Sequence, residues 1–340
     1  MRPVRWPVRM LALLAVGVTV ASTLPVASVV KPRTLFAWPN AASGLLATPT
    51  HRNQIGQVIA PVMIDGKGPF RFLMDTGANG SVVSTGLVRA LGLRPVQTVN
   101  EQVEGTTGTA RLPCVAVASM RIGNIVKRNL RLPVSDSPLL RGLDGILGMA
   151  GFGAARVTID FQGNRVAIGR SEPGVPLRQG FLDIPAQRTP GGLLMIPGHV
   201  GSVAVNAVID TGSEGTIGND ALRQALLREI TKKTIETTIY GVTRQVSKGG
   251  VAAAPPIYLG PVAIQHLAIV YSDIPIFKDW NLDKGPALLV GMNVLGTVDA
   301  LVLDYSRARV EILPNTAAGE SVVVRYLYHS TLITKKDGSD

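Results

Sequence analysis

Short apolar runs that end at small or charged turn residues recur along the chain, a pattern typical of strands and hairpins. Val58 to Ile64 run up to a turn at residues 65–68, and Phe70 to Met74 return from it. Leu193 to Ile196 and Val203 to Ile209 repeat this arrangement later in the chain. The pattern predicts an all-β protein with few short helices.

Two helices and two further strands are expected. The first helix is predicted from about Thr85 to Leu91. The second begins at Asn219-Asp220, which supplies a polar cap, and extends to Ile230 as the longest helix that the sequence predicts. Val115 to Met120 and Leu130 to Val134 are strand candidates, separated by a turn at residues 122–124.

The same pattern divides the chain into two similar units with irregular segments around them. Prolines, glycines and small polar residues predict a linker before the first unit and a connection, rather than a packed element, between the units. The expected boundaries are an export segment at 1–33, a linker at 34–56, a first unit at 57–170, a connection at 171–192, a second unit at 193–313 and a tail at 314–340. The sequence assigns no role to the apolar stretch from Val322 to Tyr328 in that tail.

The tripeptide Asp-Thr-Gly occurs once in each unit, at residues 75–77 and 210–212, and each copy ends an apolar run. Gly105 lies 30 residues after Asp75 and Gly241 lies 31 after Asp210, each in a stretch typical of a hairpin tip. Two apolar segments with Gly-Met follow in the same order, at residues 146–149 and 289–292. A single copy would indicate only a turn at a strand end. Two copies with matched flanks predict one paired site.

This arrangement resembles the aspartic proteases of the retropepsin and pepsin superfamily, whose halves each carry an Asp-Thr/Ser-Gly turn, a flap hairpin and an apolar-apolar-Gly segment. The resemblance covers roughly Gln57 to Leu313 and is strongest to bacterial retropepsin-like proteins with two units fused in one chain. It implies two retropepsin-like β-barrel lobes related by pseudo-twofold symmetry. With both aspartates on one chain, a monomer is expected to suffice.

The resemblance implies that Asp75 and Asp210 form the catalytic pair. Two carboxylates about 3 Å apart retain one shared proton, because like charges that close cannot both ionise, as in aspartic proteases generally. One carboxylate then takes a proton from water while its protonated partner polarises the scissile carbonyl. The pattern does not assign the proton to either residue.

Six neighbouring residues are expected to support this pair: Thr76, Gly77, Ala78, Thr211, Gly212 and Ser213. The glycines permit a tight turn that directs backbone N–H groups toward a carboxylate. The resemblance implies that the threonines hydrogen-bond to the opposite half beneath the pair. It also implies that a serine at position 213 donates to its aspartate, which Ala78 cannot do, so the halves are expected to be electrostatically unequal.

The flap candidates are Gly105, Thr106, Thr107 and Gly108 in the first unit and Tyr240 and Gly241 in the second. The glycines are equally compatible with a plain surface hairpin. Tyr240-Gly241 is similar to the Tyr-Gly of pepsin flaps, which pepsins carry in the first half. Which flap dominates is left open.

Composition narrows the choice of function. Apolar residues make up 46 % of the chain and charged residues 17 %, which indicates a folded body. The net charge is +11, but five positive charges lie in residues 1–33, which hold no acid, and the remainder carries +6. No nucleic-acid-binding motif accompanies this charge, so no nucleic-acid partner is expected. Cys114 is the single cysteine and the four histidines are scattered, so no cofactor or metal is expected.

The N-terminus has the layout of a secretory signal. Three arginines precede an apolar run from Met10 to Val20, and small residues follow it. The alternative is an uncleaved membrane anchor at residues 10–30, although Pro25 weakens such a helix. The protein is therefore expected to be exported, either periplasmic or secreted, or anchored by its N-terminus and facing outside the cytoplasm.

These observations predict an aspartic-type endopeptidase that acts on extended peptides, with apolar pockets that favour hydrophobic residues at the cut. The main alternative is a catalytically silent peptide- or protein-binding module with the same fold. A third possibility is an obligate dimer in which each unit pairs with another chain, but fusion in one chain favours intramolecular pairing. Residues 34–54 could also block the cleft before activation.

Overall fold

The computed structural model describes residues 46–49, 51–52, 57–149, 155–171, 174, 176–230, 234–315 and 322–324. All of them belong to one compact unit, Trp38–Asp340. The expected export segment lies outside the described residues, and so do most of the linker and most of the tail. None of the helices in the described ranges is long and apolar enough to cross a membrane.

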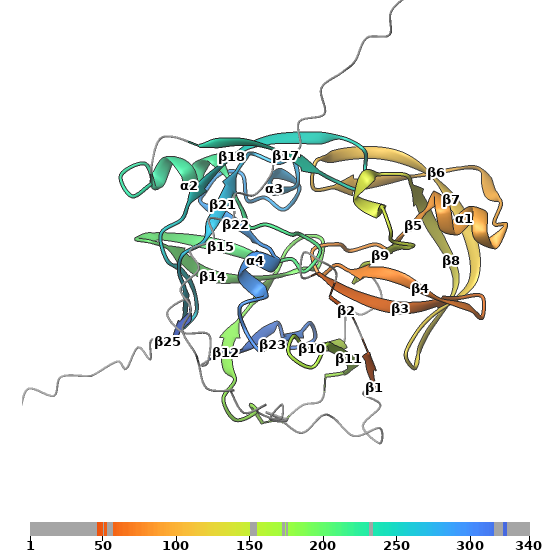
Figure 1. Ribbon diagram of the computed structural model, residues 1–340, viewed down its shortest axis with the longest axis horizontal. Helices are drawn as coiled ribbons and strands as arrows, with labels where there is room; N and C mark the ends of the chain where they lie inside the picture. The colour runs from red at the N-terminus through yellow and green to blue at the C-terminus, as the bar shows by residue number, and fades with distance from the viewer. Residues whose placement is uncertain are drawn as a thin grey trace, which may run out of the picture. The chain divides into compact units, whose positions relative to one another are not determined.

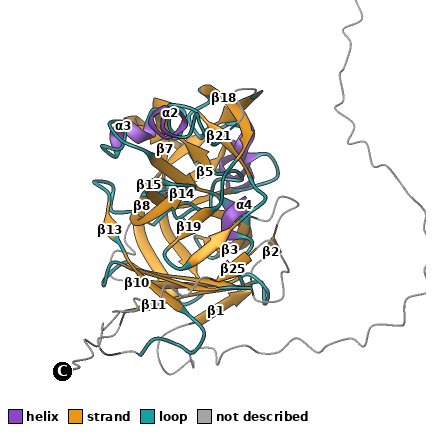
Figure 2. Cartoon of the chain, turned by 90° about the vertical axis from the view of Figure 1, so that its left-hand side faces the viewer, coloured by secondary structure: helices purple, strands orange, loops and turns teal. Residues whose placement is uncertain are grey.

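Strands dominate the described residues and form three sheets (Figures 1 and 2), so the all-β prediction is confirmed. The first sheet has the order β2 (His51–Arg52), β3 (Val58–Ile64), β4 (Lys67–Met74), β9 (Gly145–Leu147), β5 (Val82–Ser84), β8 (Ile125–Ser135), β7 (Gly108–Ile122), β6 (Pro95–Gly105).

The second sheet comes entirely from the second half, in the order β17 (Ile235–Tyr240), β18 (Val246–Ala253), β21 (Ala268–Tyr271), β16 (Ile217–Gly218), β22 (Ala287–Val290), β15 (Val203–Ile209), β14 (Leu194–Val200), β19 (Ile257–Leu259), β20 (Val262–Ile264), β25 (Val322–Val324). The short β13 (Gln187–Arg188) pairs with β14 at its side. Strand β25, from the apolar stretch without an assigned role, extends this sheet by pairing with β20.

Both sheets place the Asp-Thr-Gly segments in the same way. In the first sheet, β9 lies between β4, to which it is parallel, and β5, to which it is antiparallel. In the second, β22 lies between parallel β15 and antiparallel β16. Each Asp-Thr-Gly turn therefore connects the two strands that flank a central buried strand, and it passes over the end of that strand. Both central strands are fully buried, in keeping with their apolar sequences.

The two sheets differ in strand length. β7 and β8 are long and continuous, whereas the matching part of the second half is divided into β18 and β19 and into β20 and β21. Pro255 and Pro256 lie between β18 and β19. Proline lacks a backbone N–H and cannot continue a ladder of hydrogen bonds, which accounts for this interruption.

A third sheet joins the halves at the bottom of Figure 1. Its order is β1 (Leu46–Pro49), β11 (Arg165–Arg170), β10 (Ala155–Asp160), β23 (Ala300–Asp304), β24 (Arg309–Leu313), β12 (Leu182–Pro185). The central pair, β10 and β23, comes from opposite halves. Strands β1 and β12 close its two edges, although residues 34–56 and 171–192 were predicted as a linker and an unpacked connection. Prolines at the ends of these strands hid them, because edge strands tolerate proline.

Four short helices accompany the described sheets. α1 (Thr85–Leu91) has the predicted bounds: Ser84 accepts a hydrogen bond from the Leu87 N–H, and Gly92 ends the helix in the left-handed conformation. α2 (Asp220–Ala225) is capped by Asn219, as predicted, but it ends before Ile230 and is shorter than α1. The prediction of a long helix here was wrong. The other two helices are α3 (Ile276–Asp279) and α4 (Met292–Leu295).

The reason for the early end of α2 lies in the turns that follow it. The Glu229 N–H donates to the Leu226 carbonyl, three residues back instead of four. The Glu229 side chain accepts hydrogen bonds from the Ser202 hydroxyl and backbone N–H in the turn between β14 and β15. A tertiary contact therefore competes with helix propensity at this end.

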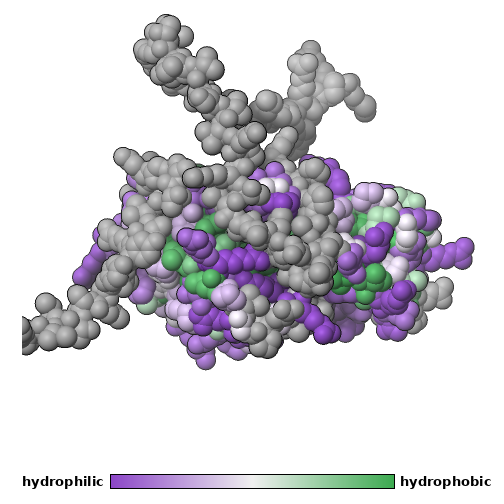
Figure 3. Space-filling view, turned by 90° about the horizontal axis from the view of Figure 1, so that it is seen from below, coloured by the Kyte–Doolittle hydropathy of each residue, from purple (hydrophilic) through white to green (hydrophobic). Residues whose placement is uncertain are grey.

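One hydrophobic core runs through all three sheets. It includes Phe72 in the first sheet, Ile209 in the second, and Ile159 and Leu301 in the third, each at most 1 % exposed. Because the halves share this core and a sheet, neither buries its apolar surface alone. The face seen from below in Figure 3 mixes hydrophilic and hydrophobic residues over its visible part.

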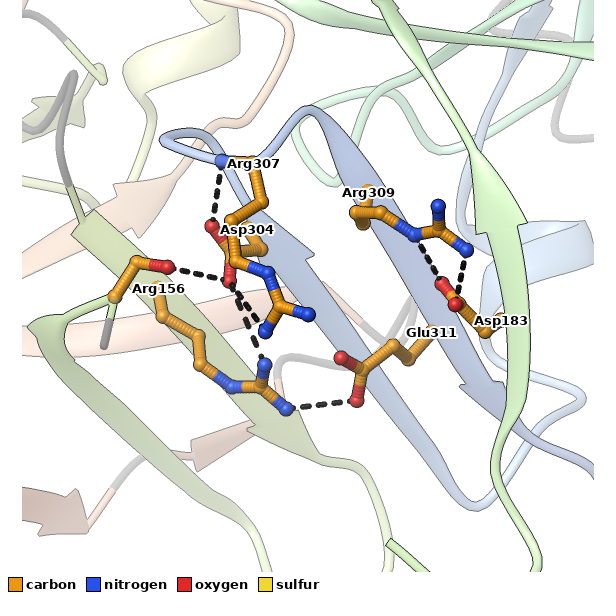
Figure 4. A network of polar contacts seen from close by, with 7 residues as sticks. Arg156, Asp183, Asp304, Arg307, Arg309 and Glu311 are labelled. Atoms are coloured by element: carbon orange, nitrogen blue, oxygen red, sulfur yellow. Dashed lines mark hydrogen bonds and ion pairs between the residues drawn. The ribbon is translucent and has the colours of Figure 1, made fainter. Parts of the chain in front are cut away.

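A buried ion-pair network ties the halves together in the third sheet (Figure 4). Arg156 on β10 lies 3.5 Å from Asp304 on β23 and 2.7 Å from Glu311 on β24. These three residues are at most 4 % exposed. The Ser171 hydroxyl donates to Asp304 at 2.7 Å, and Arg307 lies 3.9 Å from the same carboxylate. Charges buried this deeply depend on each other, because each was removed from water to form the network.

We expect Arg156→Ala to lower the free energy of unfolding by about 3–5 kcal/mol, since it leaves two buried carboxylates without their central cation. The matched control is Arg309→Ala, which removes the partly exposed pair with Asp183 in the same sheet. That pair is expected to contribute only about 0–1 kcal/mol. Urea unfolding of both variants measures the difference, and equal losses would contradict the structural importance of the network.

Candidate active site

The two Asp-Thr-Gly turns meet where β4 and β15 end. The Asp75 N–H donates to the Leu147 carbonyl of β9 at 3.0 Å, and the Asp210 N–H donates to the Val290 carbonyl of β22 at 3.0 Å. Beyond each aspartate the chain crosses the end of the central strand so closely that a Cβ on Gly148 or Gly291 would overlap a backbone carbonyl of the turn. These matched contacts fix both aspartates on the rigid ends of sheets.

Thr76 and Thr211 bond the two turns to each other. The Thr76 hydroxyl donates to the Ile209 carbonyl at 3.0 Å and accepts from the Thr211 N–H at 3.0 Å. Reciprocally, the Thr211 hydroxyl donates to the Met74 carbonyl at 2.7 Å and accepts from the Thr76 N–H at 3.1 Å. Both side chains are completely buried. Each hydroxyl thus uses a donor and an acceptor function, and four hydrogen bonds hold the turns in register.

Gly77 and Gly212 make the close approach of the carboxyl groups possible. A Cβ on Gly77 would overlap the carboxyl group of Asp210, and a Cβ on Gly212 would overlap that of Asp75. Their N–H groups donate to their own aspartates, at 2.9 Å to Asp75 Oδ1 and at 2.8 Å to Asp210 Oδ1. Each glycine therefore supports the carboxylate of its own half and leaves space for that of the other.

Burial and proximity perturb both carboxyl groups. Desolvation and then the charge of the neighbouring Asp210 hold the pKa of Asp75 well above its ordinary value. Burial also raises the pKa of Asp210, but hydrogen bonds from Asp75 and from the N–H groups of Gly212 and Ser213 oppose this shift. The pair consequently retains a proton at pH values where isolated aspartates are ionised.

The predicted inequality between Ala78 and Ser213 takes a different form from the one expected. The Ser213 hydroxyl donates to the Gly215 carbonyl at 2.7 Å, not to the aspartate. Its backbone N–H donates to Asp210 Oδ1 at 3.2 Å. In the first half, the Ala78 N–H donates to the Asp75 carbonyl at 3.4 Å. The two halves thus differ in backbone geometry, and Asp210 receives more hydrogen bonds than Asp75.

Tyr305 is a further difference between the two halves, and the sequence did not predict a role for it near the aspartates. It follows β23 at the position where Phe161 follows β10, and it is 2 % exposed. Burial, then the charges of Asp75 and Asp210, raise the pKa of this phenol above its ordinary value. Its hydroxyl has no hydrogen-bond partner among the described residues. A neutral phenol therefore lies within electrostatic range of the aspartate pair on one side only.

Two hairpins, β6–β7 and β17–β18, approach each other at the top of Figure 1. We call β6–β7 with its tip Gly105–Gly108 flap 1, and β17–β18 with its tip Gly241–Gln245 flap 2. The tips touch: the Thr107 hydroxyl donates to the Gln245 carbonyl at 2.7 Å, and a Cβ on Gly105 would lie 3.1 Å from Val242 and Thr243. Thr106 lines the cavity below. Tyr240, in contrast, is 54 % exposed, because strand alternation places it on the outer face.

Flap 2 is fastened to the opposite half. The Ser135 hydroxyl donates to the Val242 carbonyl at 2.6 Å, and the Ser137 hydroxyl donates to the Gly241 carbonyl at 2.6 Å. Arg244 pairs with the exposed Asp136 between them. We refer to residues 135–137 as the latch. The two serines are buried, so their bonds contribute more than the exposed ion pair.

The sequence contained a signal for the latch that was not used. Ser-Asp-Ser-Pro at 135–138 and Ser-Asp-Ile-Pro at 272–275 are a further matched landmark of the two halves. Their roles differ, since the Ser272 hydroxyl donates at 2.7 Å to the Lys248 carbonyl within its own half. Gln57 was also missed, and here no repeat points to it. Its side-chain amide donates to the Gly212 carbonyl at 2.5 Å, across 155 residues of sequence.

A cavity of about 660 Å³ reaches the aspartate pair. Asp75 and Asp210 line its floor, and residues 78–82 and flap 1 residues 101–106 form one wall. The apolar lining includes Val82, Leu139, Ile146, Leu193, Ile276 and Trp280. Its size and mixed lining suit a peptide segment. No group of three or more potential metal ligands occurs in the described part of the chain.

Comparison with known proteins adds one finding. Residues 60–150, which include the first Asp-Thr-Gly turn and flap 1, match the family model described as aspartyl protease. No curated protein matches the chain.

The threonine bonds give a direct test of how the site is held. Thr76→Val keeps the side-chain shape but orphans the Ile209 carbonyl and the Thr211 N–H, so we expect a loss of about 2–5 kcal/mol in the free energy of unfolding. Thr76→Ser, which keeps the hydroxyl, is the matched control and is expected to lose much less. Denaturant unfolding compares them, and equal losses would indicate that the methyl group, not the hydroxyl, stabilises the turns.

Proposed function

We propose that the chain is an aspartic endopeptidase, and the match of residues 60–150 to the aspartyl protease family model supports a protease-type function. Asp75 and Asp210 together activate the attacking water. The single observation that carries this proposal is the reciprocal fit of each carboxyl group against the glycine of the opposite turn, which permits two buried carboxyls to share one proton. The two Asp-Thr-Gly units act as fused retropepsin-like halves of one site.

In the proposed reaction, Asp210 is the ionised base and Asp75 carries the proton. Asp210 accepts hydrogen bonds from two backbone N–H groups, and Asp75 accepts one, so negative charge is better stabilised on Asp210. Water held between the carboxyls gives a proton to Asp210 as its oxygen attacks the scissile carbonyl carbon. Asp75 donates a hydrogen bond to the carbonyl oxygen, and the departing nitrogen then takes up a proton from the pair.

The proposed substrate is an extended peptide. The apolar lining residues Ile146, Ile276 and Trp280 support a preference for hydrophobic side chains beside the cut. Strands of flap 1 offer backbone groups above the peptide, as strand pairing of substrates requires. We also propose that the protein acts outside the cytoplasm, on the basis of its N-terminal sequence alone.

A silent binding module is less well supported than an enzyme, because both carboxyls retain the hydrogen bonds and burial that perturb their pKa values. Intermolecular pairing of units is also less well supported. The four threonine hydrogen bonds already join the two turns within one chain. We therefore propose a monomer.

The proposal is tested by incubating the full chain with a mixed peptide library and identifying the products by mass spectrometry. Asp75→Asn and Asp210→Asn are each expected to lower cleavage by about 10²–10⁴-fold, because either change removes acid–base catalysis from a shared site. Circular dichroism controls for folding. Cleavage that persists in either folded variant would exclude the shared pair, and no cleavage by the parent between about pH 4 and 7 would favour the binding module.

The raised pKa values predict how stability depends on pH. A carboxyl whose pKa is higher in the folded state binds its proton more tightly there, so its contribution is full below the unfolded pKa and is lost as pH rises through the folded one. Asp75→Asn removes this penalty. We expect the variant to be more stable than the parent at neutral pH, with an advantage that shrinks toward about pH 4.

Thermal unfolding across this pH range measures the difference. Asp283→Asn, at an exposed aspartate, is the control for a general effect of removing one negative charge. A difference between Asp75→Asn and the parent that stays constant with pH would argue against a shared proton in the folded protein.

A further inference from the structure

The cavity at the aspartates is not symmetric about them. Its lining includes residues 78–82 after the first turn and residues 101–106 of flap 1, together with Leu193, Ile276 and Trp280 from the second half. Flap 2 contributes Val242 alone to the lining, and the second turn contributes Asp210 alone. The open space therefore lies mainly on the side of the pair that flap 1 covers.

The side chain of Gln57 bonds to a backbone carbonyl of the second Asp-Thr-Gly turn. Its amide donates to the carbonyl of Gly212, and the residue is 3 % exposed. Gln57 immediately precedes β3, and the residue that immediately precedes β14 in the second half is Leu193. Leucine has no side-chain hydrogen-bond donor, and both Leu193 and Gly77 line the cavity. A side-chain amide thus caps the carbonyl of the turn glycine in the second half, whereas the position that matches Gln57 holds a leucine.

The latch restricts the movement of flap 2. Flap 2 is bonded to the first half through Ser135 and Ser137, at 2.6 Å each. Ser272, the counterpart of Ser135, donates within its own half instead and so does not fasten flap 1 in the same way. The fastened flap 2 and the capped Gly212 carbonyl come from different elements of the second half.

We propose that this protease binds its substrate one-sidedly, with Gln57 as a specificity-determining residue. The peptide is held along the side of the aspartates beneath flap 1, where strand and turn backbone groups are open to it. On the other side, the Gly212 carbonyl is already bonded and flap 2 is fastened, so residues there contribute little binding energy. This inference rests on the proposed function for its substrate class but concerns the direction in which the cleft extends.

The test uses peptides with one scissile bond that are lengthened one residue at a time, either N-terminal or C-terminal to that bond. For the full-length parent we expect kcat/KM to rise about fivefold with each added residue that makes a net hydrogen bond on one side, and to stay within about twofold on the other. The series that shows the length dependence, N-terminal or C-terminal, identifies which end of the peptide lies beneath flap 1. Equal dependence on both sides would overturn the proposal.

Two variants test the residues. Gln57→Met is nearly isosteric but removes the donor, and it is expected to restore length dependence on the insensitive side. Ser135→Ala loosens the latch and is expected to do the same. The matched control is Ser171→Ala, whose hydroxyl donates to Asp304 beside the third sheet, and this variant is expected to leave the parent profile. The ratio between the two arms is the readout, since a uniform loss of activity through misfolding leaves it unchanged. Unchanged ratios in both Gln57→Met and Ser135→Ala would overturn the assignment to these residues.

Failure of the proposed endopeptidase function can be distinguished from failure of one-sided binding. If the parent cleaves none of the peptides, the endopeptidase proposal fails, and calorimetric titration of the parent with the same length series still tests the cleft. Affinity that rises with length on one side alone would support one-sided binding without catalysis. Affinity that rises equally on both sides would overturn it.

Discussion

The structure depends on bringing two buried carboxyl groups within reach of a shared proton, an approach that is unfavourable unless both chains around them are held rigidly. The reciprocal bonds of Thr76 and Thr211 supply that rigidity at the point of contact. The glycines remove the Cβ atoms that would prevent the approach. The shared core and the β10–β23 pairing extend the constraint outward, because halves that slid past each other would separate the aspartates.

Features set by neighbouring residues were predictable from the sequence, and features set by the opposite half were not. The hairpins and α1 follow from local alternation, turn residues and the Ser84 and Gly92 caps. The predicted length of α2 was wrong because Glu229 bonds to Ser202 in a turn that is distant in sequence. The aspartate turns were predictable because they repeat. The Ser135 and Gln57 contacts span 107 and 155 residues. The repeated Ser-Asp-x-Pro marks Ser135 but does not identify its partner in the other half, and no repeat marks Gln57.

Two similar scaffolds in one chain are free to differ, whereas in a homodimer every substitution appears on both sides of the site. The differences here concentrate around the aspartates: Tyr305 stands where the other half has Phe161, and Gln57 where it has Leu193. The buried backbone framework, in contrast, is closely matched, as the paired bonds of Leu147 and Val290 indicate. The two halves thus differ in groups beside the carboxyls, and they match in the backbone bonds that position the carboxyls.

The chain buries carboxylates in two settings, and the contrast separates structure from chemistry. Asp304 and Glu311 are neutralised by Arg156, which makes them part of a charge network that joins the halves. Asp75 and Asp210 are instead contacted by backbone N–H groups and by each other, and burial raises their pKa values. A guanidinium at that position would have fixed both aspartates in the ionised form and removed the proton that the proposed reaction needs. Surrounding the pair with weak dipoles rather than a full positive charge keeps that proton available, while cations stabilise the fold elsewhere.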